Sequence, residues 1–243
     1  MTAVFVHGVP DTPAMWEPLV GALAFEENAY STLALPGFGT EVPAGFSSTK
    51  DAYLNWLIEA LEAVYTASGP VDLVGHDWGA LLCVRAAHQR PDLLRTWAVS
   101  NALPEPGYRW HKAARQWQTP VLGELVMALV TQSRLEQGLV DAGMPAALAA
   151  HEAPFMNKTM KRSILKLYRS AKTMPLDWGT DLSGLPDRGL VIWGDQDPYV
   201  DISIARQFCL RRGVDLHVEE GAGHWAVCER PERIAERLKR HWT

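Results

Sequence analysis

Short apolar runs alternate with longer amphipathic stretches along the first hundred residues. Continuous apolar runs bounded by turn residues are typical of strands buried in a sheet. They predict strands at 2–6, 30–35, 71–74 and 93–100. The stretches between them predict helices at 13–24, 49–67 and 78–89. In the second helix apolar residues recur at helical spacing, and Ser48 with Asp51 resembles a capping box at its start.

The pattern changes between residues 104 and 183, where the sequence is helical without a convincing strand and is rich in Trp, Tyr, Arg and Lys. Alternation then resumes, with strands at 189–193 and 214–218 and helices at 202–211 and from 231. Strands alternating with helices predict an α/β fold with a mostly parallel sheet and helices on both faces. We expect a core domain of residues 1–103 and 184–243. Residues 104–183 are expected to form a helical cap over the carboxyl ends of the strands, where such sheets bind ligands.

Composition excludes several classes of protein. The 243 residues carry a formal net charge of −5 without a basic tract, so no nucleic-acid partner is expected. No apolar run reaches the ~18 residues of a membrane span, and the first residues do not resemble a signal peptide. We therefore expect a cytoplasmic protein with no membrane partner. The scattered Cys83, Cys209 and Cys228 are predicted to be core residues, and the His, Asp and Glu residues show no metal-ligand spacing, so neither metal nor cofactor is expected.

The sharpest local signal is Gly75-His76-Asp77-Trp78-Gly79, which follows an apolar strand and opens a helix. Its spacing is that of a nucleophile elbow, a strained strand-to-helix turn, with Asp where Ser usually stands. Such a turn needs small neighbours, and Gly75 and Gly79 supply them. The N-terminus of the following helix favours negative charge, which suits an ionised Asp77. The alternative is that Asp77 only caps the helix, as Asp often does.

Two further residues follow later strands in the same way. Asp197 comes after the strand at 189–193, and His224 lies on a glycine-rich loop after the strand at 214–218. Because the carboxyl ends of parallel strands meet at one edge of a sheet, we expect Asp77, Asp197 and His224 to lie together. Taken alone, Asp197 is also typical of a turn and His224 of a loop histidine with satisfied hydrogen bonds. Their order, nucleophile then acid then base, favours the catalytic interpretation.

These residues make the sequence similar to the α/β-hydrolase superfamily, and within it to the branch of epoxide hydrolases and haloalkane or haloacid dehalogenases that use an Asp nucleophile. The resemblance covers nearly the whole chain. Outside the helical segment it rests on His7–Pro10, Leu35–Gly39, Gly75–Gly79, Asp197 and His224. Within that segment, Tyr168-Arg169 with Trp178 downstream, and Trp117–Pro120, resemble the cap of epoxide hydrolases.

The resemblance implies a hydrolase that acts on a small apolar electrophile in two steps. Asp77 attacks carbon and forms an alkyl-enzyme ester, and His224, oriented by Asp197, activates the water that hydrolyses it. The oxyanion hole is expected to be the backbone N–H groups of Val9 and Trp78. Tyr168 is the expected proton donor to an epoxide oxygen, although a tyrosine that only packs the cap is the alternative.

Hydrolysis of an epoxide to a vicinal diol is the favoured reaction, and dehalogenation is the alternative. A dehalogenase would hold the halide with the indole of Trp78 and with a second tryptophan of the cap. Trp110, Trp117 and Trp178 are the candidates for that second donor. A further alternative is a protein of the same fold that binds small molecules without turnover. The sequence predicts neither the natural substrate nor the oligomeric state.

Four features depart from the family pattern. The chain begins at what would be the family's third strand, so the usual N-terminal hairpin is expected to be missing. Val9 replaces the aromatic residue common in epoxide hydrolases and the halide-binding Asn of many dehalogenases. The second cap tyrosine of epoxide hydrolases would fall near Ala113, where Tyr108 and His111 are the nearest substitutes. Asn101 stands where some dehalogenases keep their acid, so Asp197 is expected to do that work.

Overall fold

The computed structural model describes residues 2–26 and 29–243, and its centre is one sheet of six strands. The strands are β1 (Thr2–Val6), β2 (Tyr30–Leu33), β3 (Val71–His76), β4 (Leu94–Ser100), β5 (Gly189–Gly194) and β6 (Asp215–Glu219). They lie in the order β2-β1-β3-β4-β5-β6, and every neighbouring pair is parallel. The predicted α/β fold is confirmed, and in the described part of the chain its sheet is entirely parallel.

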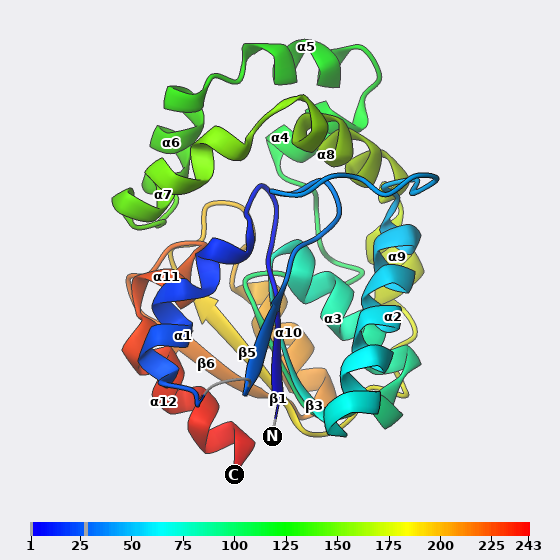
Figure 1. Ribbon diagram of the computed structural model, residues 1–243, viewed down its shortest axis with the longest axis vertical. Helices are drawn as coiled ribbons and strands as arrows, with labels where there is room; N and C mark the ends of the chain where they lie inside the picture. The colour runs from blue at the N-terminus through cyan, green and yellow to red at the C-terminus, as the bar shows by residue number, and fades with distance from the viewer. Residues whose placement is uncertain (1, 27–28) are drawn as a thin grey trace.

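Helices cover both faces of the sheet (Figure 1). One face carries α1 (Glu17–Leu23), α11 (Ala226–Glu229) and α12 (Pro231–Trp242), and the other carries α2 (Lys50–Ser68), α3 (Trp78–Gln89) and α10 (Ser203–Arg212). Successive side chains of a strand point to opposite faces. In β1, Ala3 and Phe5 therefore pack with the first group, and Val4 and Val6 pack with the second. Burial on both faces explains why these strands are continuous apolar runs.

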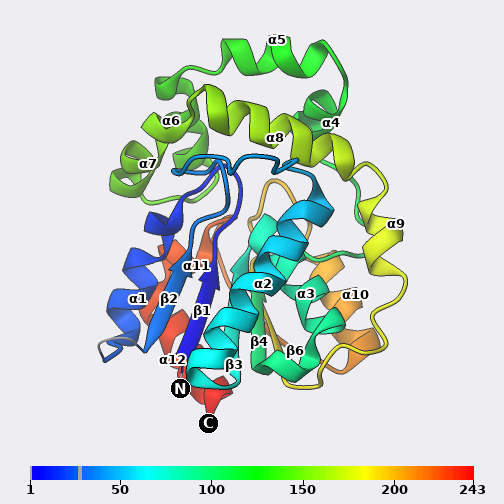
Figure 2. The same ribbon diagram turned by 45° about the vertical axis from the view of Figure 1, so that its right-hand side comes forward.

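A block of helices is inserted between β4 and β5, and it contains no strand. It consists of α4 (Lys112–Gln118), α5 (Leu122–Leu129), α6 (Gln132–Asp141), α7 (Ala146–Glu152), α8 (Lys158–Ser170) and α9 (Met174–Gly179). Figures 1 and 2 show α4 to α8 lying across the carboxyl ends of the strands, at the opposite end of the molecule from the two termini. This is the position expected for a cap. That residues 104–183 form a domain of their own remains a prediction.

Most element boundaries differ from the prediction by a residue or two, and three of the differences at helix or strand ends have a clear local reason. The helix expected at 13–24 is divided into the 3-10 turn η1 (Pro13–Trp16) and α1. Strand β2 ends at Leu33 because the N–H of Leu35 donates to the ring of His7 (3.0 Å) instead of to a strand. The capping interpretation of Ser48 is wrong. Its φ is 57°, and Thr49 is the residue whose side chain accepts the N–H of Ala52.

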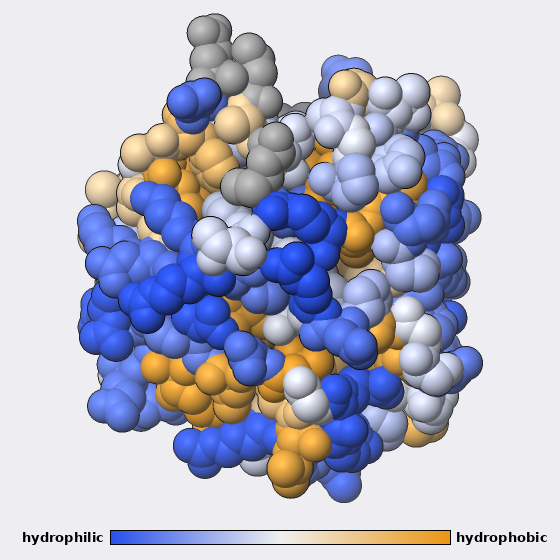
Figure 3. Space-filling model, turned by 90° about the horizontal axis from the view of Figure 1, so that it is seen from below, coloured by the Kyte–Doolittle hydropathy of each residue, from blue (hydrophilic) through white to orange (hydrophobic). Residues whose placement is uncertain are grey.

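Cys83, Cys209 and Cys228 are buried free thiols, as predicted. In the described ranges no helix has both the length and the apolar character needed to cross a bilayer. Seen from the end where the termini lie, apolar residues reach the surface in separate patches between charged ones (Figure 3). A further turn, η2 (Pro91–Leu93), leads into β4, and η3 (Ala153–Phe155) follows α7.

Gly79 offers a test of how closely α3 packs on the sheet. A Cβ at this position would lie 2.1 Å from the carbonyl oxygen of Val6. We expect Gly79→Ala to lower the free energy of unfolding by about 3 kcal/mol, because backbone must move to admit the methyl group. Urea unfolding monitored by circular dichroism measures the change.

Gly21 is the matched control. It lies inside α1, and a Cβ there would meet nothing within 4 Å. Gly21→Ala should stabilise the protein by about 0.5–1 kcal/mol, since Ala has the better helix propensity. Equal effects of the two substitutions would contradict this account of the packing.

Candidate active site

Asp77 occupies a strained turn between β3 and α3. Its φ is 49° and its ψ is −118°, values that a residue other than glycine rarely adopts. The backbone of Gly8 passes directly beside it, and a Cβ on Gly8 would lie 2.6 Å from the Cβ of Asp77. A Cβ on Gly75 would lie 2.5 Å from the carbonyl oxygen of Gly79. The predicted elbow is present, and its glycines are required by these close approaches.

The carboxylate of Asp77 is held from two sides. The backbone N–H of Val9 donates to Oδ1 (2.9 Å), and Oδ2 lies 3.5 Å from Nε2 of His224. Trp78 is the first residue of α3, so its backbone N–H is one of those that lack a partner within the helix. The side chain of Asp77 is 15% exposed, against 3% for His224. Of this pair, Asp77 is therefore the more accessible to a bound molecule.

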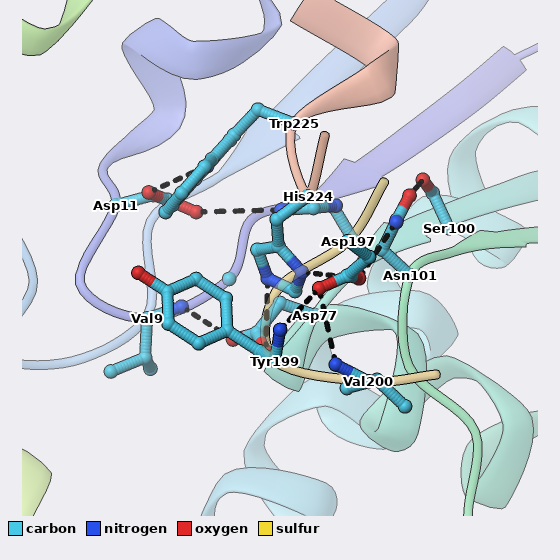
Figure 4. A network of polar contacts seen from close by, with 12 residues as sticks. Val9, Asp11, Asp77, Ser100, Asn101, Asp197, Tyr199, Val200, His224 and Trp225 are labelled. Carbon is cyan, nitrogen blue, oxygen red and sulfur yellow. Dashed lines mark hydrogen bonds and ion pairs between the residues drawn. The ribbon is translucent and has the colours of Figure 1, made fainter. Parts of the chain in front are cut away.

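Asp197 holds the opposite edge of the imidazole (Figure 4). Its Oδ2 lies 2.7 Å from Nδ1 of His224 and also accepts a hydrogen bond from the side-chain amide of Asn101 (2.9 Å). Its Oδ1 accepts the backbone N–H groups of Tyr199 (2.8 Å) and Val200 (3.1 Å). Both oxygens of this buried carboxylate are thus fully bonded, and its position is fixed. The position of Asn101 follows from its place after β4, directly beside β5.

Two carboxylates dominate the electrostatics of His224. Burial by itself lowers the pKa of an imidazole. Here the charge and hydrogen bond of Asp197, together with those of Asp77, outweigh burial and raise the pKa of His224 to about 10. Burial acts the other way on Asp197, but the charge of His224 and its bonds to His224, Asn101 and Tyr199 lower its pKa below the ordinary value. With both carboxylates charged, His224 is an imidazolium.

A cavity of about 360 Å³ lies between the sheet edge and the inserted helices, and Asp77 and His224 line it. Most of its wall is apolar or aromatic, and α4, α5, α6 and α8 all contribute to it. Tyr168, on α8, lines the same cavity and is 3% exposed. Its ring packs edge-on against Trp78 and Trp117, with centroids 5.3 and 4.9 Å apart. The residue predicted as leaving-group donor is therefore in the same cavity as the predicted nucleophile.

Neutral donors surround this part of the cavity. Burial raises the pKa of Tyr168 well above its ordinary value, and the charge of Asp77 raises it further. His111 also lines the cavity. Its Nδ1 accepts the N–H of Ala114 (3.3 Å), so its proton is on Nε2, and burial lowers its pKa to about 4. Tyr108 is a third donor in the wall, and the pKa of its hydroxyl is likewise raised by burial.

Sequence reasoning missed a pair of buried acids next to this site. Asp11 is fully buried, accepts the indole N–H of Trp225 (3.1 Å) and lies 4.0 Å from the ring of His76. Glu152, at the end of α7, accepts the hydroxyl of Thr12 (2.9 Å). Burial raises the pKa of Asp11 well above the ordinary value and that of Glu152 to about 7. Asp11 directly follows the Val9-Pro10 turn, which was a usable signal, whereas nothing in the sequence around Glu152 indicates it.

Comparison with known proteins agrees with the fold. Residues 3–237 match the profile of the "Alpha/beta hydrolase family". The chain belongs to the alpha/beta hydrolase family. The match makes it a hydrolase of this family, but membership alone does not say which bond it hydrolyses. In the described parts of the chain no three His, Cys, Asp or Glu side chains are grouped to hold a metal ion, and a reaction without cofactor stays a prediction.

Relatives within the alpha/beta hydrolase family carry different activities in their names. The chain is 29% identical to an (E)-2-((N-methylformamido)methylene)succinate hydrolase of Acinetobacter baylyi, over 97% of this chain and 88% of that protein. It is 24% identical to epoxide hydrolase 2 of Caenorhabditis elegans (95% and 70% covered) and to a haloalkane dehalogenase of Mycolicibacterium paratuberculosis (97% and 81%).

The solved structure of a 2-hydroxy-6-oxo-6-phenylhexa-2,4-dienoate hydrolase from Rhodococcus superposes with a TM-score of 0.82 at 18% identity, covering 99% of this chain and 90% of that one. At this identity the likeness shows the fold alone. The superfamily prediction is thus confirmed. The roles of Asp77, Asp197, His224, Val9, Trp78 and Tyr168 stay predictions, as do the compartment and the partners.

Glu152 makes stability depend on pH in an unusual direction. Its pKa is about 7 when folded, against an ordinary 4.5, so the unfolded chain loses this proton first as the pH rises. The folded state is therefore destabilised progressively between about pH 4.5 and 7, and the penalty is complete above that window. Glu152→Gln keeps the acceptor for Thr12 and removes the charge. It should be more stable than the unsubstituted protein by up to ~3 kcal/mol at pH 8, with the difference vanishing near pH 4.5.

Urea unfolding at several pH values measures this difference. Glu220→Gln, at an exposed position, is the control and should change stability little at any pH. A stability gain of Glu152→Gln that grows on acidification would contradict the assigned cause.

Proposed function

We propose that this chain is an epoxide hydrolase that works through a covalent ester on Asp77. The observation that carries the proposal is the joint placement of a carboxylate, a paired histidine and neutral hydrogen donors in one apolar cavity. The relatives named as epoxide hydrolases are consistent with it. The site residues act in two steps, each of which follows from their geometry.

In the first step Oδ2 of Asp77 attacks a ring carbon of the epoxide, and the carbon–oxygen bond of the ring breaks. A carboxylate is ionised at neutral pH, so this attack needs no general base. Oδ1 stays bound to the N–H of Val9, so Oδ2, which lies 3.5 Å from Nε2 of His224, is the oxygen that attacks. An ester substrate would give a mixed anhydride at the same carboxylate, so esterase activity is disfavoured.

In the second step water attacks Cγ of the ester while the neutral imidazole of His224 takes a proton from it. The bond between Cγ and Oδ2 then breaks, and the diol oxygen takes that proton back from His224. The resulting oxyanion at Oδ1 is stabilised by the backbone N–H groups of Val9 and Trp78, a contribution of about 3 kcal/mol each in comparable sites. Esterification removes the negative charge of Asp77. One of the two charges that raise the pKa of His224 is then gone. The imidazolium therefore gives up its proton more readily, to the deprotonated donor of the first step, and the neutral imidazole that accepts a proton from water is formed.

The epoxide oxygen needs a proton donor, and two side chains supply one. The hydroxyl of Tyr168 and the Nε2–H of His111 both belong to the cavity wall, and neither group is charged. We propose Tyr168 as the donor that transfers the proton and His111 as the second hydrogen bond to the same oxygen. His111 thereby takes the place of the second tyrosine that epoxide hydrolases carry near this position.

Dehalogenation is the second candidate, and one observation favours it. Trp117 lines the cavity, and its indole N–H has no hydrogen-bond partner among the described residues. A halide needs such N–H donors. Trp78, the expected first donor, is 1% exposed and does not line the cavity. A single available indole supports halide binding less well than a hydroxyl with a histidine supports an epoxide.

Replacing His224 should separate the two steps. We expect His224→Gln to react once and then retain the ester, so its mass rises by that of the substrate in a mass spectrum of the intact protein. Asp77→Asn is the control and should show neither turnover nor added mass. Styrene oxide and a bromoalkane are suitable probes. Substrate binding to His224→Gln without any gain in mass would contradict the covalent mechanism. If the unsubstituted protein binds substrate without turnover, and Asp77→Asn binds it with the same affinity, the chain is a binding protein.

The leaving group decides between the two reactions. A panel of terminal, aryl and cyclic epoxides with chloro- and bromoalkanes is assayed for diol and for halide. We expect the unsubstituted protein to form diol. Tyr168→Phe should lower kcat for diol formation by about 10²–10³-fold, a range typical for loss of a general acid. Trp117→Phe is the matched control and should keep most diol formation. Halide release that depends on Asp77 and Trp117, without diol, would establish dehalogenation instead.

A further inference from the structure

Helix α5 exposes an apolar face at the outermost part of the inserted region (Figures 1 and 2). Val121, Leu122, Leu125 and Leu129 are all exposed, Leu125 and Leu129 by 60% and 66%. Half of the large apolar side chains exposed in the described residues belong to this one segment. Leu122, Leu125 and Leu129 recur at helical spacing, so they share one face. A contiguous exposed apolar patch of this kind marks an interaction surface.

This face is continuous with the wall of the active-site cavity. Leu129 is exposed and also lines the cavity, next to Val126 and Val130. Arg134 and Gly138, on α6, line the cavity and are exposed as well. The cavity therefore opens to the surface along α5 and α6, and whatever covers the apolar face also covers its mouth.

The charge of the surrounding surface indicates what the occupant is. Residues 104–183 carry ten Lys and Arg against seven Asp and Glu, whereas the rest of the chain carries thirteen against twenty-one. On α8, Lys158, Arg162 and Lys166 are exposed at intervals of four residues, and none of them forms an ion pair with another described residue. Like charges at this spacing destabilise a helix. Such a row is instead favourable where it meets an anionic surface.

Two more cations lie at the carboxyl end of the apolar face itself. Lys161 donates to the carbonyl of Val130 (2.8 Å), and Arg134 donates to the carbonyl of Leu129 (3.3 Å). Leucines flanked by Lys and Arg are the arrangement with which an amphipathic helix lies in the plane of a membrane surface. Anionic lipids attract such basic residues. A second copy of the chain would bring two surfaces of the same positive charge together, which disfavours it as the occupant.

We propose that α5 and the basic row of α8 dock this protein on the surface of a membrane that contains anionic lipid. No helix among the described residues is long and apolar enough to cross the membrane, and the docking does not depend on the proposed reaction. The composition led to the opposite expectation, no membrane partner, because the net charge of −5 adds a positive inserted region to a more strongly negative remainder. Docking holds the mouth of the cavity against the lipid, where apolar molecules are concentrated.

Vesicle co-sedimentation tests the proposal with the 243-residue chain. One set of vesicles is pure phosphatidylcholine, and in the other about a third of the lipid is phosphatidylglycerol. We expect the unsubstituted protein to bind the anionic vesicles. The double variant Leu122→Gln/Leu125→Gln should bind them at least about tenfold more weakly. Neither residue lines the cavity. Leu210→Gln is the matched control, since Leu210 is 86% exposed on α10, and should bind like the unsubstituted protein.

The charge contribution is tested separately. In the triple variant Lys158→Gln/Arg162→Gln/Lys166→Gln, the preference for anionic over neutral vesicles should be at least about tenfold smaller than in the unsubstituted protein. Thermal melting checks that each variant is folded. Absence of binding to anionic vesicles, or equal binding by the α5 double variant and the Leu210 control, would overturn the proposal. A dimer in solution that the α5 double variant converts to monomers would overturn it too, because a second copy would then cover this face.

Discussion

The backbone of Asp77 is held at a φ of 49°, a conformation that costs a residue with a side chain about 1–3 kcal/mol. The surrounding structure maintains it. The N–H of Asp77 donates to the carbonyl of Ser100 on β4, and the helix that begins at Trp78 is packed so closely that Gly79 touches the backbone of β1. The strain projects the carboxylate beyond the sheet edge toward Val9. The loops after β1, β4, β5 and β6 are arranged around that one side chain, so the site depends on the turn.

The same edge of the sheet sets how the three charged groups of the site are arranged. Asp197 is fully bonded and buried, and His224 is buried between two carboxylates. Asp77 and His224 both line the cavity, and Asp77 is the more exposed of the two. A buried imidazolium is stable here only because both neighbours are negative. The proposed chemistry removes one of those charges and restores it at the end of the cycle. The basicity of His224 would therefore change with the covalent state of Asp77 without any movement of the chain.

Much of this could be predicted from the sequence because it is local. The elbow is encoded by Gly75 and Gly79, and parallel strands bring the loops that carry Asp197 and His224 to the same edge. Contacts across long distances in the chain could not be predicted. The bond between Thr12 and Glu152 joins the core to α7, and neither residue belongs to a recognisable motif. The sequence named His111 only as a substitute for a missing tyrosine, and its tautomer could not be predicted, since it is set by the N–H of Ala114 at the start of α4.

The inserted helices also determine that the hydrogen-bond donors in the cavity wall are uncharged. Burial in the same apolar wall raises the pKa of Tyr168 and lowers that of His111, so both groups are neutral and each keeps one hydrogen to donate. A cation in their place would pair with Asp77 and weaken it as a nucleophile. Neutral donors add no positive charge beside Asp77 beyond that of His224, yet they stabilise an oxygen on which negative charge develops. Desolvation by the insertion thus makes this wall suited to an oxygen leaving group that faces a charged nucleophile.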